Sequence, residues 1–136
     1  MNVTSTGSVG VLVVEDEREM CQRICWFLRS RGFQAEGVGD GRQALSRLQR
    51  EEFAAVIADV RLTRSHDLDL VREIQRLEGF RPWVVYTGAP DSAPTHRVEQ
   101  RGVFCILLKG APMKELLWSA EEACRAASTD QQARCA

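Results

Sequence analysis

Short apolar runs alternate along the chain with segments whose apolar residues recur at helical spacing. The runs lie at 9–14, 33–38, 54–58, 83–86 and 103–108. Most of them carry no charge and no alternation of apolar and polar residues, which is typical of strands buried on both faces of a parallel sheet. The second run contains Gln34 and Glu36, so we expect it at an edge of the sheet. This alternation predicts an α/β fold built on one five-stranded sheet.

The segments between and after these runs are predicted to form helices that face the sheet with one apolar stripe. The residues expected on these stripes are Cys21, Ile24, Phe27 and Leu28; Ala44, Leu45 and Leu48; Leu68, Val71 and Ile74; Val98; and Met113, Leu116, Leu117, Ala120, Ala123 and Ala127. Gly32 and Gly79 are placed to end the first and third helices. The fourth helix, near 95–101, has one clear core residue and is expected to be the least stable.

The length of 136 residues indicates a single domain, which we place at 9–127 between a disordered extension at 1–8 and a flexible tail at 128–136. The net charge of -1 gives no general attraction to nucleic acid or to anionic membranes. The start lacks the pattern of a signal peptide, and no apolar run is long enough to span a membrane, so we expect a cytoplasmic protein. The five cysteines form no CxxC pair, which favours free thiols over disulfides or a zinc site.

Polar side chains follow most of the predicted strands. Glu15 and Asp16 follow the first strand, Asp59 the third, Thr87 the fourth and Lys109 the fifth. Each also has an ordinary explanation: Asp16 and Glu19 could cap the next helix, for example. Asp59 could cap a turn, and Lys109 could be a solvated loop residue. The carboxyl ends of parallel strands meet at one edge of a sheet, and such folds bind ligands there. The presence of polar residues after four of the five strands therefore favours a functional site.

The residue types in this set favour a cation and a phosphoryl group. Three neighbouring carboxylates repel one another unless a cation joins them, and carboxylate oxygens suit Mg²⁺. A phosphoryl group on the Asp59 carboxylate would be neutralised by that cation and by Lys109, and the Thr87 hydroxyl would donate to it. Asp59 is therefore the candidate phosphoacceptor.

In the motifs VVEDE, VIADVRL, VVYTG and ILLKG, the chain resembles the receiver domain of response regulators in two-component signalling, over residues 9–127. The resemblance implies a flavodoxin-like, doubly wound sheet with strand order 2-1-3-4-5 and five helices. It also implies that a histidine kinase or a phosphotransfer protein phosphorylates Asp59, and that Thr87 and Lys109 contact the phosphoryl group. The Mg²⁺ ligands would be Glu15, Asp16, Asp59 and the backbone carbonyl of Arg61.

A receiver of this kind is a signalling module rather than an enzyme, and it switches the binding of a partner. The partner is expected to be a second copy of the chain or a target protein, bound through the last two helices. Trp118 falls outside the apolar stripe of the last helix and is a candidate for that surface.

Several positions depart from the family pattern. Thr63 and Gly110 replace prolines that usually follow the phosphoacceptor and the lysine, and Asp67 replaces a glycine. Ile106 stands where the family has the aromatic residue that moves with the threonine. Since a β-branched side chain is stiff, we expect the signal to leave through residues 88–101 instead.

These departures keep a second hypothesis open, in which the chain is a phosphate-independent adaptor with a receiver fold. Two other classes are disfavoured. A haloacid-dehalogenase-type phosphatase needs a second Asp where this chain has Arg61, and the acids Glu15 and Asp16 would repel the phosphate of a flavin.

Overall fold

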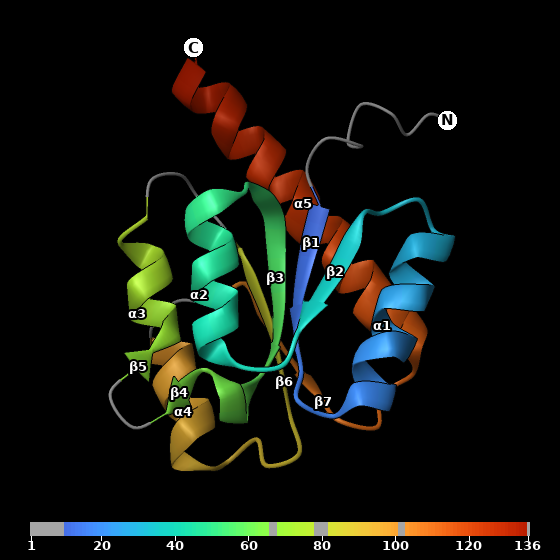
Figure 1. Cartoon of the computed structure of the whole chain (residues 1–136), viewed down its shortest axis with the longest axis vertical. Coiled ribbons are helices and arrows are strands. Elements are labelled where there is room, and N and C mark those ends of the chain that lie inside the picture. Colours follow the sequence, from blue (N-terminus) through green and yellow to red (C-terminus); the bar gives the residue numbers. More distant parts are fainter. Residues whose placement is uncertain (1–9, 66–67, 78–81, 101–102, 136) are drawn as a thin grey trace.

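The computed structural model describes residues 10–65, 68–77, 82–100 and 103–135. Its main sheet contains β1 (Gly10–Val14), β2 (Ala35–Val38), β3 (Phe53–Asp59), β6 (Trp83–Thr87) and β7 (Cys105–Leu108). These strands pair in parallel in the order β2-β1-β3-β6-β7 (Figure 1). Counted along the chain, this is the order 2-1-3-4-5, with the second strand at an edge as predicted. The fold is therefore a doubly wound, flavodoxin-like sheet.

Helices cover both faces of this sheet (Figure 1). One face carries α1 (Arg18–Ser30) and α5 (Met113–Cys135), and the other carries α2 (Gly41–Arg50), α3 (Leu70–Gln75) and α4 (Ala93–Gln100). In β1, Val11 and Val13 pack toward α1 and α5, whereas Leu12 and Val14 pack toward the other helices. Because both faces are covered, the inner strands β1, β3 and β6 are largely apolar without alternation.

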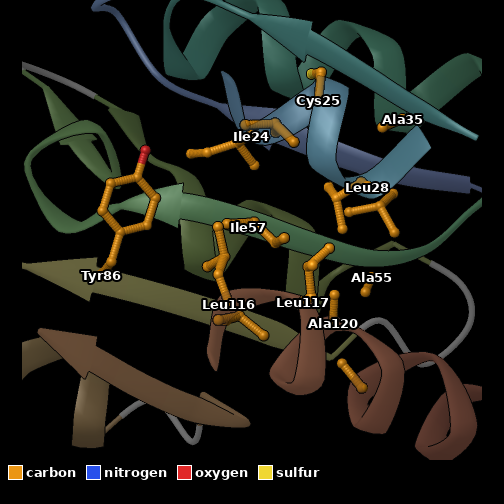
Figure 2. Packing of buried hydrophobic residues seen from close by; sticks show 14 residues of the cluster. Ile24, Cys25, Leu28, Ala35, Ala55, Ile57, Tyr86, Leu116, Leu117 and Ala120 are labelled. Atoms are coloured by element: carbon orange, nitrogen blue, oxygen red, sulfur yellow. The ribbon is translucent and has the colours of Figure 1, made fainter. Parts of the chain in front are cut away.

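The core between the sheet and the pair α1 and α5 is built from the predicted stripes. Ile24 of α1 and Leu116 and Leu117 of α5 lie around Ile57 of β3 (Figure 2). Ile24 and Ile57 are almost completely buried. Full burial of a side chain of this size contributes about 1.5–3 kcal/mol, so these contacts fix the two helices against the sheet.

Helix α1 does not begin with Asp16 as its cap. Its N-cap is Glu17, whose own side chain makes no capping hydrogen bond. The alternative explanation, in which Asp16 and Glu19 cap this helix, therefore does not hold. Instead the Glu15 carboxylate accepts from the Glu17 backbone N–H at 2.9 Å, which leaves the exposed Asp16 carboxylate outside the helix.

The segment that follows β3 contains short regular elements. It contains a 3-10 turn at Val60–Leu62 and an antiparallel pair of short strands, β4 (Arg64–Ser65) and β5 (Leu68–Asp69). Helix α3 consequently begins at Leu70. Its N-cap is Asp69, whose side chain accepts a hydrogen bond from the Arg72 N–H at 3.2 Å. The predicted positions Asp67 and Gly79 lie outside the described residues.

The structure tests the predicted domain boundary at the C-terminal end but not the one at the N-terminal end. Helix α5 continues to Cys135, past the predicted end near Ala127. Residues 128–135 contain no glycine or proline, so a helix that is anchored by the packed residues before them can propagate. The predicted extension at 1–8 lies outside the described residues, and the flexibility of 128–136 stays a prediction. Within the described residues, no helix is long and apolar enough to cross a membrane.

Candidate functional site

The parallel pairing brings the predicted residues to one edge of the sheet. Val14 is paired with Ala58, Asp59 with Tyr86, and Thr87 with Leu108. The residues that follow these positions, Glu15 and Lys109 among them, therefore leave the sheet at the same edge. This is the edge that the strand-end pattern predicted.

Three carboxylates gather at this edge. One oxygen each of Glu15, Asp16 and Asp59 lies within 4.8 Å of the others. Glu15 and Asp59 are buried, at 3% and 0% exposure, whereas Asp16 is exposed. Oxygen ligands at this spacing suit a divalent cation such as Mg²⁺, so the donor set fits the predicted metal.

The Asp59 carboxylate is held from several sides. Its Oδ1 accepts from the Arg61 backbone N–H at 3.0 Å, and its Oδ2 accepts from Lys109 Nζ at 2.7 Å. Burial acts to raise the pKa of this carboxyl, but hydrogen bonds from Arg61 and Lys109 outweigh it and hold the pKa below its ordinary value. Asp59 is therefore an ionised carboxylate at neutral pH, as a nucleophile must be.

The side chain of Arg61 makes contacts that the sequence did not predict. Its Nε and Nη2 donate to Asp59 Oδ2 at 3.1 and 2.7 Å, and its Nη2 lies 3.3 Å from Asp16 Oδ1. The guanidinium thus joins two of the three acids while its side chain stays 58% exposed. The only feature of the sequence that could have indicated these contacts is the position of an Arg two residues after a strand-end Asp.

Lys109 reaches back over the strand ends, so the alternative of a solvated loop lysine is wrong. Besides its contact with Asp59, its Nζ lies 5.7 Å from the centre of the Tyr86 ring. The chain turns directly after it at Gly110, whose φ of 92° favours glycine. A proline, which the family usually has here, could not adopt that φ.

Tyr86 makes a second contact that the sequence did not predict. Its hydroxyl donates to Glu15 Oε1, and its side chain is 5% exposed. Burial and the neighbouring Glu15 raise the pKa of this phenol well above its ordinary value, so it stays a donor. Tyrosine next to a strand-end Thr was the only signal in the sequence.

Thr87 is buried, and its hydroxyl faces the start of helix α4 rather than the acids. Its hydroxyl accepts from the Ala89 N–H at 3.0 Å and lies 3.1 Å from the Thr95 hydroxyl. The Thr95 hydroxyl also donates to the Ala89 carbonyl at 2.8 Å. Thr95, which is 1% exposed, thus links the strand end to the first turn of α4.

Comparison with known proteins identifies one family. The family described as response regulator receiver domain matches residues 11–121. Among curated relatives, the Transcriptional regulatory protein GlrR of Escherichia coli is 26% identical over 126 residues, covering 91% of this chain and 28% of that protein. The DNA-binding response regulator MtrA of Mycobacterium tuberculosis is 27% identical over 107 residues, covering 79% of this chain and 46% of that protein. The chain thus spans less than half the length of these relatives.

Solved structures give the same fold. A response regulator receiver domain protein of Methanospirillum hungatei superposes with a TM-score of 0.80 at 17% identity, covering 90% of this chain and 98% of that one. A response regulator receiver protein of Pseudomonas putida gives a TM-score of 0.74 at 28% identity, covering 85% of this chain and 98% of that one.

Proposed function

Because the chain belongs to the response regulator receiver domain family, a module of two-component signal transduction, we propose that Asp59 accepts a phosphoryl group from a histidine kinase or a phosphotransfer protein. The observation that carries this proposal is the buried, ionised Asp59 carboxylate, which contacts Lys109 and lies beside two further acids. A carboxylate oxygen attacks phosphorus, the bond from phosphorus to the donor's imidazole nitrogen breaks, and the electron pair leaves with that nitrogen.

The other residues of the site would bind Mg²⁺ and the phosphoryl oxygens. Glu15, Asp16, Asp59 and the backbone carbonyl of Arg61 would hold Mg²⁺, which when bound neutralises charge on the acids and on the phosphoryl oxygens. Lys109 is close enough to Asp59 to bind an oxygen of the incoming group. Thr87 would donate its hydroxyl to another oxygen, which requires it to move away from Thr95.

Arg61 has to move before the reaction. Its backbone N–H holds one oxygen of Asp59, and its guanidinium shares the other with Lys109. An incoming phosphoryl group must therefore displace at least the guanidinium. Since this side chain is 58% exposed, it can swing into solvent without disturbing the core.

The test is phosphorylation of Asp59→Asn by acetyl phosphate or by a histidine kinase. The variant is expected to take up no phosphoryl group because an amide is not a nucleophile toward phosphorus. Asp40→Asn is a matched control, because Asp40 caps α2 and asparagine caps a helix equally well. Labelling of Asp59→Asn at the rate of this control would show that another residue is the acceptor.

A second candidate function is the phosphate-independent adaptor. The observation that favours it is the contact of the Arg61 guanidinium with Asp16 and Asp59, because this side chain gives the acids a counterion from within the chain. Beryllofluoride with Mg²⁺ separates the two functions, because it binds as a phosphoryl mimic to a competent Asp. Saturable binding that Asp59→Asn abolishes supports the phosphoacceptor, and absence of binding supports the adaptor.

A further inference from the structure

Tyr86 lies beside both an acid and the lysine of the proposed site. It is the single tyrosine of the chain, and on β6 it is paired with Asp59 of β3. Its ring belongs to the apolar cluster between the sheet and α1 and α5. Figure 2 shows it at one end of that cluster, with the hydroxyl at the far end of the ring. The apolar side of the residue is thus fixed by packing, and its polar end is free to serve the site.

The hydroxyl of Tyr86 completes the surroundings of Glu15. This carboxylate is 3% exposed, and its two oxygens have different partners: Oε1 accepts from Tyr86 and Oε2 accepts from the Glu17 backbone N–H. A buried carboxylate is costly unless its oxygens are satisfied. One partner belongs to the backbone, so Tyr86 is the side chain that sets the direction of the carboxylate.

The ring of Tyr86 reaches a second group of the site. Lys109 Nζ lies 5.7 Å from the ring centre and 2.7 Å from Asp59 Oδ2. At that distance an ammonium is attracted to the face of an aromatic ring. The same rigid side chain therefore contacts a proposed metal ligand through its hydroxyl and the proposed phosphate-binding lysine through its ring.

We propose that Tyr86 is a positioning residue, whose hydroxyl orients Glu15 for Mg²⁺ and whose ring supports Lys109 over Asp59. The proposal deepens the phosphoacceptor function and rests on it. Partners of metal ligands in the outer shell typically change metal affinity by roughly 10- to 100-fold when they are removed. Because Tyr86 holds one of three acids and the Glu17 N–H remains, we expect the lower end of that range, about tenfold.

The first experiment is calorimetric titration of the folded proteins with MgCl₂. Tyr86→Phe, which keeps the ring, is expected to weaken Mg²⁺ binding about tenfold. Its rate of phosphorylation by acetyl phosphate should fall at low Mg²⁺ and return to the wild-type rate at saturating Mg²⁺. Lost packing alone would not be rescued by the cation. In a Glu15→Gln background, Tyr86→Phe should change the affinity little further, since its effect passes through that carboxylate.

A second experiment uses the wild-type chain and does not depend on how any variant folds. Tyrosine labelled with ¹³C at Cζ gives one resonance, because the chain has one tyrosine. Titration with MgCl₂ should shift this resonance as Glu15 changes its hydrogen bond, with the same affinity that calorimetry reports.

The outcomes separate this proposal from the function on which it rests. Absence of saturable Mg²⁺ binding in the wild-type chain overturns both. Wild-type binding with an unchanged affinity in Tyr86→Phe, or with an unmoved tyrosine resonance, overturns the role of Tyr86 alone. An equally large effect of Tyr86→Phe in the Glu15→Gln background also overturns it, because Tyr86 would then act elsewhere.

Discussion

The guanidinium of Arg61 lies among the acids for which the sequence indicates a cation. That the strand-end residues would meet could be predicted, because parallel strands bring their carboxyl ends together whatever the side chains are. The contacts of Arg61 and Tyr86 could not be predicted. They depend on side-chain rotamers and on the register of strand pairing that sets Tyr86 beside Asp59. These two residues are where the site of this chain acquires properties of its own.

The phosphoryl group is expected to be lost slowly from Asp59. A water molecule attacking phosphorus needs an acceptor to orient it, but the Ala89 side chain has no polar atom and the Arg61 guanidinium is no acceptor. Arg61→Asn combined with Ala89→Glu should therefore speed autodephosphorylation by about tenfold, measured as loss of label from the purified phosphoprotein. Arg64→Asn, a change of an exposed arginine on β4, is the control. An unchanged rate in the double variant would refute the role of these positions.

Lys109 is expected to make stability depend on pH through Asp59. Since the folded-state pKa of Asp59 is lowered, its stabilising contribution is fully present above the ordinary Asp pKa of about 3.9 and is lost as pH falls through the lower, folded-state pKa. Lys109→Met should raise that folded pKa. At pH 7 it should reduce the free energy of unfolding by about 1–2 kcal/mol, because Arg61 still pairs with the buried carboxylate.

Urea unfolding at neutral pH and again well below the Asp pKa checks this expectation. The difference between Lys109→Met and the wild-type chain should shrink at the acid end, where Asp59 is protonated in both the folded and the unfolded state. Lys114→Met, at an exposed position in the first turn of α5, should leave both measurements nearly unchanged. A difference that stays constant with pH would mean that Lys109 stabilises the fold by packing.

At the scale of elements, strands were easier to predict than helix starts. Continuous apolar runs define a strand that is covered on both faces, whereas a helix start is decided by which local group caps it. Asp69 delays α3 by capping it, and Asp16 is drawn toward Arg61 instead of capping α1. Polar contacts of this kind compete within a few residues, so composition alone does not decide among them.

Helix α4 is the element through which phosphorylation is expected to act. Ile106 cannot rotate as the family's aromatic residue does, and α4 buries only Val98 as a large apolar residue together with Thr95. The Thr95 hydroxyl joins Thr87 to this helix. Movement of Thr87 toward a phosphoryl group would break that contact, so we expect residues 88–100 to change their order while Ile106 changes little.

Hydrogen exchange with and without beryllofluoride and Mg²⁺ measures this coupling. In the wild-type chain, exchange in 88–100 should change on binding. In Thr95→Val, which keeps the shape but removes the hydroxyl, that change should be lost and stability should fall by about 1 kcal/mol. Thr95→Ser keeps the hydroxyl and should behave as the wild type does. Changes confined to the loop after Asp59 would show that the signal leaves by another route.

At the scale of the whole molecule, the surface carries large apolar side chains that the fold does not use. Trp118 on α5 is 63% exposed, and Leu108 and Phe104, at the two ends of β7, are 55% and 41% exposed. Buried Trp is among the residues that contribute most to protein interfaces, whereas an exposed one gains little for the fold. We therefore expect Trp118 to lie in the surface through which the chain binds a second copy or a target protein.

Trp118→Ala is the variant that tests this surface, and Trp26→Ala is its matched control, since Trp26 on α1 is 64% exposed. Loss of an interface tryptophan typically costs about 2 kcal/mol, which corresponds to roughly 30-fold in Kd. Sedimentation of the beryllofluoride-bound protein should show that loss of self-association for Trp118→Ala but not for Trp26→Ala. If self-association is absent, the same comparison applies to binding of a purified target. A large fall in melting temperature for Trp118→Ala would instead assign the residue to the core, and equal effects of both substitutions would deny Trp118 a special part in binding.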